Sequence, residues 1–250
     1  MSEQVQQQVA LVTGASSGIG RAIAQRLAVG GYHVVVCARR LERLTTLVDE
    51  VTHQGGIISA IPADLRQEAE ILNLFNAIRQ QWGGVDVLVN NAGLGHKEPL
   101  MSGDTEHWRE MLEVNVLALC ICTREAIQDM QTKGGQGHII HINSMSGHRV
   151  PGASGVYSAT KHAVSALTEG LRLELRAAGS PIRVSAISPG YVETEFAEKY
   201  AKSADHAKAI YSQFPVLQPE DIAEAVWYVL SQPPHVQVHD ILVRSTQQPS

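Results

Sequence analysis

Short apolar runs alternate with amphipathic stretches along the whole chain. Most of the runs are rich in β-branched residues and apolar on both faces, which is typical of strands in a parallel sheet that helices cover on each side. These predicted strands occupy 9–13, 32–37, 57–61, 85–89, 138–142, 182–187 and 240–244.

The stretches between the runs have a helical period, as in LFNAIRQQW and ALTEGLRLELRAAG, and glycines such as those at 30–31, 55–56 and 83–84 follow them. Glycine commonly ends a helix, so each cluster indicates a helix stop before the next strand. A final helix is expected to begin at Pro219-Glu220-Asp221, because proline and acidic residues favour a first turn. The alternation predicts an α/β fold, a single-domain Rossmann-type doubly wound parallel sheet of seven strands with helices on both faces.

The composition is that of an ordinary soluble globular protein, with 44% apolar residues, 18% charged residues and a formal charge of −5. A nucleic-acid or anionic membrane partner would need a basic excess, so neither is expected. The N-terminus has no signal sequence, and no apolar run is long enough for a membrane span. Three cysteines within apolar runs indicate buried thiols of a reducing compartment, and we expect a cytoplasmic protein.

No metal site is expected. His138, His141 and His148 are the histidines that would suggest one, but the spacing of His138 and His141 puts these two on opposite faces of a strand, and no converging ligand set is visible.

A glycine-rich turn, TGASSGIG at 13–20, lies between the first strand and the first helix. There, Gly14, Gly18 and Gly20 would allow a tight turn, close approach of a pyrophosphate to backbone amides, and close helix packing. The alternative is a tight turn with no ligand.

The end of the second strand indicates which dinucleotide would bind. An enzyme that uses NAD generally has an acidic residue about 20 positions past the glycines, but the chain has Ala38 there, followed by Arg39 and Arg40. Arg39 can offer a planar donor fork to a 2′-phosphate, which favours NADP(H), although the two arginines could also be a solvated surface pair.

Further motifs follow in order: Asp64-Leu65, the NNAG of 90–93, Asn115, Ser144, YSATK from Tyr157 to Lys161, and Pro189-Gly190. With the glycine turn, they resemble a short-chain dehydrogenase/reductase over essentially the whole chain. The stretches NSMSGHRV and LTEGLR further resemble a branch that contains animal ketosteroid reductases and insect farnesol dehydrogenases, and LQPEDIAEAVWYVLSQPPHV resembles bacterial 3-hydroxy acid dehydrogenases.

This resemblance implies four catalytic residues, Asn115, Ser144, Tyr157 and Lys161. Together with the glycine turn and the two arginines, it implies a cofactor-binding set of Gly14, Ser16, Ser17, Gly18, Ile19, Gly20, Arg39, Arg40, Asp64, Leu65, Asn91, Ala92, Gly93, Tyr157, Lys161, Pro189, Gly190, Val192 and Thr194.

Tyr157 and Lys161 lie one helical turn apart, on one face of a predicted helix. Interconversion of an alcohol and a carbonyl needs proton transfer at oxygen, and a free tyrosine with a pKa of roughly 10 is a poor base at neutral pH. A cation about 4 Å from the phenolate is worth roughly 4 kcal/mol at an effective dielectric constant near 20, enough for a shift of about three pKa units. We therefore expect Lys161 to lower the pKa of Tyr157.

The expected function is NADPH-dependent carbonyl reduction, reversible as alcohol oxidation, on a small-molecule substrate. By the resemblance, the segment near 191–216 of the single domain, 1–250, would form a substrate lid. Its aromatic residues favour an apolar ketone or aldehyde, or alternatively they anchor the lid: Tyr191, Phe196, Tyr200, Tyr211 and Phe214.

Two other functions stay open. Arg149 could bind a carboxylate, which would favour a 3-hydroxy acid as substrate, and the chain could also be a silent NADPH-binding protein. A homo-oligomer, a tetramer or a dimer, is expected from the resemblance, and small residues such as Ala159, Ala163 and Ala166 in the helix that carries Tyr157 are compatible with it.

Overall fold

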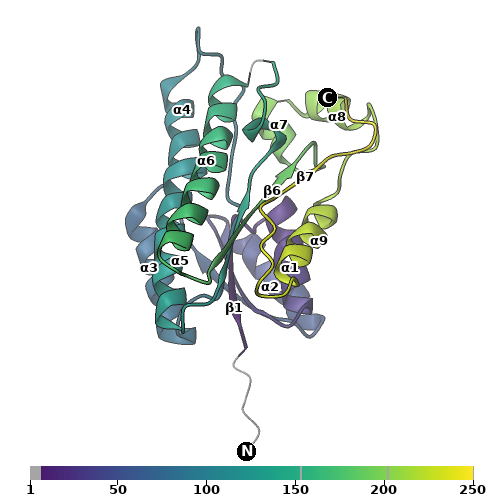
Figure 1. Ribbon diagram of the computed structural model, residues 1–250. Helices are drawn as coiled ribbons and strands as arrows, with labels where there is room; N and C mark the ends of the chain where they lie inside the picture. Colours follow the sequence, from purple (N-terminus) through teal and green to yellow (C-terminus); the bar gives the residue numbers. More distant parts are fainter. Residues whose placement is uncertain (1–6, 153, 202, 250) are drawn as a thin grey trace, which may run out of the picture.

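A parallel sheet runs through the middle of the computed structural model, which describes residues 7–152, 154–201 and 203–249 (Figure 1). Its strands are β1 (Val9–Thr13), β2 (His33–Ala38), β3 (Ile57–Pro62), β4 (Val87–Asn90), β5 (His138–Ile142), β6 (Arg183–Pro189) and β7 (Asp240–Val243). They are ordered β3-β2-β1-β4-β5-β6-β7, and every neighbouring pair is parallel. The predicted Rossmann-type α/β fold is confirmed, with each strand within three residues of its expected bounds.

Helices fill the connections between the strands and cover both faces of the sheet (Figure 1). They are α1 (Gly18–Val29), α2 (Leu41–His53), α3 (Glu68–Trp82), α4 (Thr105–Leu112), the π-helical turn η1 (Glu113–Leu117), α5 (Ala118–Thr132), the 3₁₀ turn η2 (Met145–Gly147), α6 (Gly155–Ala177), α7 (Phe196–Ala201), α8 (Ala204–Tyr211) and α9 (Pro219–Leu230).

The core consists of two layers, one on each face of the sheet. On β1, Ala10 and Val12 belong to the layer with α1, α2 and α9, whereas Val9 and Leu11 belong to the layer with α3, α5 and α6. Successive side chains of a strand point to opposite faces, so a strand covered on both sides needs apolar residues at every position. This is why most of the runs in the sequence are apolar on both faces.

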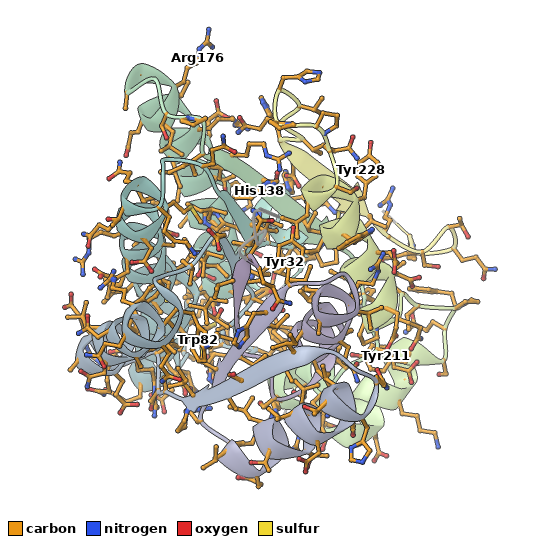
Figure 2. The ribbon with its side chains drawn as sticks, turned by 90° about the horizontal axis from the view of Figure 1, so that it is seen from below. Tyr32, Trp82, His138, Arg176, Tyr211 and Tyr228 are labelled. Carbon is orange, nitrogen blue, oxygen red and sulfur yellow. The ribbon has the colours of Figure 1, made fainter. Side chains whose placement is uncertain are left out.

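The two histidines of β5 lie inside the sheet in separate polar contacts. His138, labelled near the centre of Figure 2, has its Nε2 2.9 Å from Ser185 Oγ, and His141 has its Nδ1 2.9 Å from Thr168 Oγ1. Burial lowers the pKa of His138 to about 3 and that of His141 to about 4, so both rings are neutral at physiological pH. Their role is structural.

The last helix begins as expected, with Pro219 in its first turn and a capping box between Gln218 and Asp221. None of the helices in the described ranges is long and apolar enough to cross a membrane.

The strand order reverses between β1 and β4, and in such sheets a crevice opens at the carboxyl ends of the strands at this point. The glycine turn follows β1, and the NNAG motif begins at the last residue of β4. Helices α7 and α8 lie beyond the same edge of the sheet (Figure 1). The fold thus brings motifs far apart in the sequence to one end of the molecule.

Candidate active site

The glycine turn after β1 is packed so closely against neighbouring residues that a side chain at its glycines would clash with them. A Cβ at Gly14, whose φ is +68°, would lie 2.8 Å from the Cα of Ala92, and one at Gly20 would lie 2.3 Å from Nδ2 of Asn91. At Gly18, with φ +56°, a Cβ would lie 3.0 Å from Thr194 Cγ2. The turn therefore needs glycine both for its backbone and for its contacts.

Asn91 holds the glycine turn against the end of β4. Its Nδ2 donates to the carbonyl oxygen of Thr13 at 2.8 Å, and the Thr13 hydroxyl accepts from the amides of Asn91 and Ala92, both at 3.0 Å. The first turn of α1 contains no acidic residue, and Ile19 packs against the core there. A glycine-rich backbone turn at the positive end of a helix fits a pyrophosphate.

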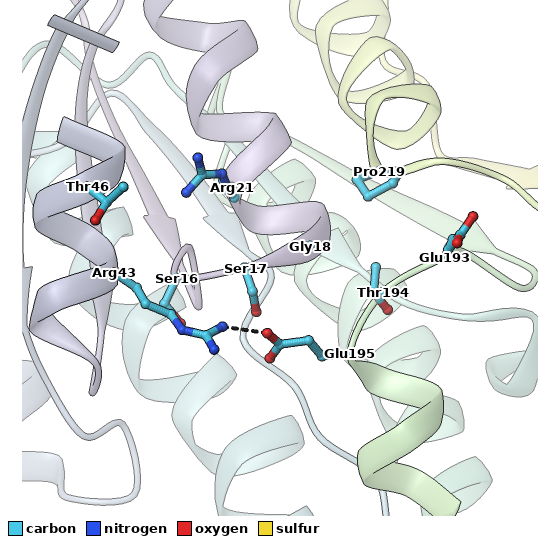
Figure 3. Close-up of a pocket in the computed structure, with 10 residues that line it drawn as sticks. All are labelled: Ser16, Ser17, Gly18, Arg21, Arg43, Thr46, Glu193, Thr194, Glu195 and Pro219. Atoms are coloured by element: carbon cyan, nitrogen blue, oxygen red, sulfur yellow. Dashed lines mark hydrogen bonds and ion pairs between the residues drawn. The ribbon is translucent and has the colours of Figure 1, made fainter. Parts of the chain in front are cut away.

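Arg40 connects the glycine turn to α2. Its Nη2 donates to Ser16 Oγ at 2.8 Å and to Ser17 Oγ at 3.1 Å. Beside these serines is an open cavity of about 450 Å³, lined by Ser16, Ser17, Gly18, Arg21, Arg43, Thr46, Glu193, Thr194, Glu195 and Pro219 (Figure 3). Polar and cationic side chains on a glycine turn suit a phosphate group.

Arg39 is not among the residues that line this cavity. Its side chain is exposed and lines a second hollow together with Leu94 and His96, and its charge helps to lower the pKa of Asp64. A hydrogen bond from Arg66 is the larger cause of that lowering, with Arg66 Nε 3.0 Å from Asp64 Oδ1. Leu65, the next residue along the chain, is buried. Of the two predicted arginines, Arg40 contacts the turn and Arg39 faces the Asp64 side.

Tyr157 and Lys161 lie on α6 and are both buried, with exposed fractions of 9% and 6%. Lys161 Nζ donates to the carbonyl oxygen of Ile142, at the end of β5, at 2.9 Å. The backbone of Gly93 approaches the same ammonium, since a Cβ at Gly93 would lie 3.7 Å from Nζ. Ser144 follows β5, and its Oγ accepts a hydrogen bond from the Ser146 amide at 3.0 Å.

The pKa of Tyr157 differs from the expectation. Burial raises it to about 12, while a hydrogen bond with Ser144 acts in the opposite direction. Burial also lowers the pKa of Lys161 to about 8. The prediction that Lys161 lowers the pKa of Tyr157 is therefore wrong for the protein alone, because loss of hydration dominates at the phenol and the ammonium donates to Ile142.

Asn115 lies in the π-helical turn η1 between α4 and α5. Its Nδ2 donates to the Leu94 carbonyl oxygen at 2.8 Å and to Thr160 Oγ1 at 3.0 Å, and its Oδ1 accepts from the Leu94 amide at 2.9 Å. The side chain thus ties the NNAG loop to α6 next to Lys161. A π-helical turn often marks a functional position, and here it lets a buried asparagine hydrogen-bond the backbone of a neighbouring loop.

The aromatic residues after β6 have two different roles. The rings of Phe196 and Tyr200 have their centroids 5.5 and 5.8 Å from that of Tyr157. By contrast, the Tyr211 hydroxyl donates to the carbonyl oxygens of Val192 and Thr194, at 3.0 and 3.1 Å. Some aromatics therefore cover the buried tyrosine, and at least one anchors the segment.

The segment after β6 is held to the body of the protein at its base. Pro189 ends β6, the Gly190 amide donates to the Val243 carbonyl oxygen at 2.7 Å, and Val192 forms a β-bridge with Leu217. Thr194 follows, beside Gly18 of the glycine turn. The structure thus brings the predicted residues of this segment to the glycine turn.

Both the sequence and the fold of this chain are similar to those of known proteins. The short chain dehydrogenase family model matches residues 8–205. The chain belongs to the short-chain dehydrogenase/reductase family. Family membership makes the protein an oxidoreductase that acts on CH–OH groups with NAD(P)(H) as cofactor.

Three short-chain family members illustrate the similarity. Dehydrogenase/reductase SDR family member 11 of Bos taurus is 53% identical, over 98% of this chain and 99% of that protein. The farnesol dehydrogenase of Aedes aegypti is 44% identical, over 94% and 95%. A solved structure, the closed form of serine dehydrogenase complexed with NADP⁺, has a TM-score of 0.91 and 35% identity, over 97% of both chains.

Two charged residues at the glycine turn of this short-chain dehydrogenase were not predicted. Arg43 lies three residues past Arg40, and this helical spacing could have placed both on one face of α2. Glu195 accepts from both arginines, but no local pattern indicates a contact across more than 150 residues.

Proposed function

We propose that this short-chain dehydrogenase uses NADP(H) to interconvert a mostly apolar ketone or aldehyde and its alcohol, with Tyr157 as the general acid and base. The observation that carries the proposal is the cover of Phe196 and Tyr200 over the buried Tyr157. A substrate carbonyl at the phenol would lie among aromatic rings, which suit an apolar ligand. The similarity to a farnesol dehydrogenase, named for an apolar terpenoid alcohol, supports the same class.

When bound, the nicotinamide supplies or accepts the hydride. Tyr157 then donates its proton to the carbonyl oxygen during reduction and takes it back during oxidation. Ser144 Oγ accepts from the Ser146 amide and its side chain also hydrogen-bonds Tyr157. We assign the Ser144 proton to the substrate oxygen once the substrate lies beside the phenol.

Lys161 has three donors, of which one is on the Ile142 carbonyl oxygen. We assign the others to the cofactor ribose and to stabilisation of the phenolate. Asn115 holds the Leu94 backbone, and with it the loop next to Lys161. Together, Tyr157, Ser144 and Lys161 favour an enzyme over the silent NADPH-binding alternative, which would have no use for this combination.

The residues that we assign to the cofactor are those of the glycine turn, the NNAG loop and the base of the segment after β6. The absence of an acid at Ala38, with Arg39 and Arg40 following it, supports a preference for NADPH over NADH. We regard the segment 191–216, which contains α7 and α8, as the lid of a single domain.

The coenzyme preference is tested by kcat/KM for NADPH and NADH. We expect NADPH to be favoured roughly tenfold to 150-fold, as one charge-assisted hydrogen bond of about 1.5–3 kcal/mol would give. Ala38→Asp combined with Arg39→Ser should reverse the preference. Equal efficiency with both coenzymes in the unaltered enzyme would rule out a 2′-phosphate contact.

A 3-hydroxy acid is the second candidate substrate. Arg149, which follows η2, is half-buried, and its side chain has no hydrogen bond or ion pair within the described residues. A guanidinium without a partner near Ser144 could bind a carboxylate. The similarity to a serine dehydrogenase is compatible with this substrate class.

A substrate panel separates the two candidates. NADPH oxidation with ketosteroids, farnesal-like aldehydes, quinones and 3-oxo acids should be most efficient with the apolar compounds, and Arg149→Ala should leave that efficiency within about threefold. Arg176→Ala, at the far end of α6 (Figure 2), is a control with the same loss of charge. Higher kcat/KM for 3-hydroxy acids, with a loss of about a hundredfold (about 2.7 kcal/mol) in Arg149→Ala only, would contradict the apolar assignment.

A further inference from the structure

Glu195 stands at the junction between the glycine turn and the lid. It precedes α7, and its carboxylate meets three cations: Oε1 is 2.5 Å from Arg43 Nη1, and Oε2 is 3.2 Å from Arg40 Nη1 and 2.7 Å from Lys199 Nζ. Figure 3 shows the pair with Arg43 at the rim of the cavity. Hydrogen bonds from Lys199 and Arg43 lower the pKa of Glu195 to about 2, so it is ionised at neutral pH.

The same arginine that binds Glu195 also binds the phosphate turn. Arg40 donates to Ser16 Oγ and Ser17 Oγ while it donates to Glu195. Nearby, Arg21 is paired with Glu50 on α2. Glu195 therefore occupies one donor each of Arg40 and Arg43 and offsets part of their positive charge. Without it, these donors would be open to an anion on the turn.

A carboxylate and a phosphate monoester are bound by arginine in the same way, through parallel N–H donors to two oxygens. Glu195 thus occupies donors that a phosphate on the cofactor ribose would need. Because Glu195 is followed directly by α7, which carries Phe196 and Tyr200 over Tyr157, its position and that of the lid are linked.

We propose that Glu195 is an internal competitor for the 2′-phosphate of the cofactor, so that phosphate binding at Arg40 and Arg43, next to Arg39, releases the start of the lid. The inference rests on the proposed use of NADP(H). Glu195 is then a positioning residue: the free protein holds its lid down through these ion pairs, and the phosphorylated cofactor weakens that hold. By linkage, release of the lid must strengthen binding of the phosphate to the same extent.

The test is binding of adenosine 2′,5′-bisphosphate and of adenosine 5′-monophosphate to the full chain, measured by calorimetry. Glu195→Gln keeps the shape and removes the charge, and because the side chain is 37% exposed the variant should fold. We expect it to bind the bisphosphate about tenfold more tightly than the unaltered protein does, with the monophosphate unchanged within twofold.

Glu193→Gln is the matched control. Glu193 lines the same cavity but accepts from Gln218 at 2.9 Å rather than from the arginines, so its loss tests the general effect of one negative charge. We expect less than a threefold change for either nucleotide.

Hydrogen exchange of residues 191–201 provides a second measurement. The bisphosphate should raise exchange in the unaltered protein, whereas Glu195→Gln should exchange faster without ligand and respond little to it. If the unaltered protein prefers the bisphosphate to the monophosphate but Glu195→Gln binds the bisphosphate no more tightly, then Glu195 does not compete with the phosphate. The NADP(H) assignment would still stand. An unaltered protein that does not prefer the bisphosphate would overturn both.

Discussion

At the scale of single residues, the chemistry depends on how burial acts on two neighbouring side chains. Tyr157 is a phenol that burial keeps protonated, and Lys161 is an ammonium that burial makes easier to deprotonate. In the free protein, these side chains are an acid ready to donate and a cation with a pKa of about 8 close to physiological pH. The phenol therefore carries the proton that carbonyl reduction needs.

Tyr157→Phe should lower turnover about a thousandfold, because the hydroxyl carries the proton and general acid catalysis is typically worth about 10²–10⁴. Cofactor affinity should stay within about threefold, whereas Lys161→Ala should lower turnover and affinity together. Steady-state rates and fluorescence titrations with NADPH measure both quantities. Substantial activity of Tyr157→Phe would contradict the assignment of the acid.

The rate of reduction should depend on pH through Lys161. With a pKa of about 8, the amine is charged below pH 8 and neutral above it, while Tyr157, with a pKa of about 12, keeps its proton throughout. We expect kcat/KM for carbonyl reduction to be level below pH 8 and to fall above it, since kcat/KM reports the free enzyme. Lys161→Arg stays charged across this range, so the activity that this variant retains should not fall above pH 8. A level profile to pH 10 in the unaltered enzyme would exclude this role.

At the scale of elements, the π-helical turn η1 links two parts of the active site. It interrupts what the sequence presents as one long helix, and the interruption lets Asn115 face both the Leu94 backbone and Thr160 of α6. A buried asparagine needs hydrogen-bond partners, and in this turn Asn115 finds them in the Leu94 backbone and Thr160.

Asn115→Ala should destabilise the protein by about 2 kcal/mol, because it leaves the Leu94 amide and carbonyl without their partner. For a chain of this size, that corresponds to a drop of about 4–8 °C in Tm. Activity should fall as well, since the loop beside Lys161 loses its support. Asn73→Ala, at an exposed position of α3, is the control and should shift Tm by less than about 2 °C. Equal thermal stability of both variants would show that the Leu94 contacts contribute nothing.

At the scale of the whole molecule, we propose that the segment 191–216 acts as a lid that controls which substrates the active site admits. Its base is fixed by the bridge between Val192 and Leu217 and by the Tyr211 hydroxyl, and its aromatic rings cover Tyr157. The remaining surface includes the outer side of α6, where Ala159, Ala166 and Leu173 are exposed. Their spacing of seven residues puts them on one side of the helix.

We expect a homo-oligomer, a dimer or a tetramer, that buries this side of α6. Leu173→Glu places a charge on it and should shift the mass in light scattering toward the monomer. Leu41→Glu is the control, because Leu41 is similarly exposed, at 48% against 55%, but lies on α2 in the opposite layer. A monomeric unaltered protein, or equal effects of the two variants, would contradict the use of this surface.

The sequence by itself determined the strands, their order of appearance and most of the candidate site. β-branched runs, glycine stops and helical periods are local features, and the motifs Gly14–Gly20, Ser144 and Tyr157–Lys161 are defined by spacing within or next to one element. Because parallel strands end at one edge of the sheet, motifs that each follow a strand come together there once the sheet has formed.

The tertiary structure alone decided the contact of Glu195 with Arg40 and Arg43, the cover of Phe196 and Tyr200 over Tyr157, and the direction of the tyrosine pKa shift. Each depends on side chains that are distant in sequence or on the water that packing removes. Spacing along the chain carries no information on either, because burial and long-range contacts arise only when the layers close around the sheet.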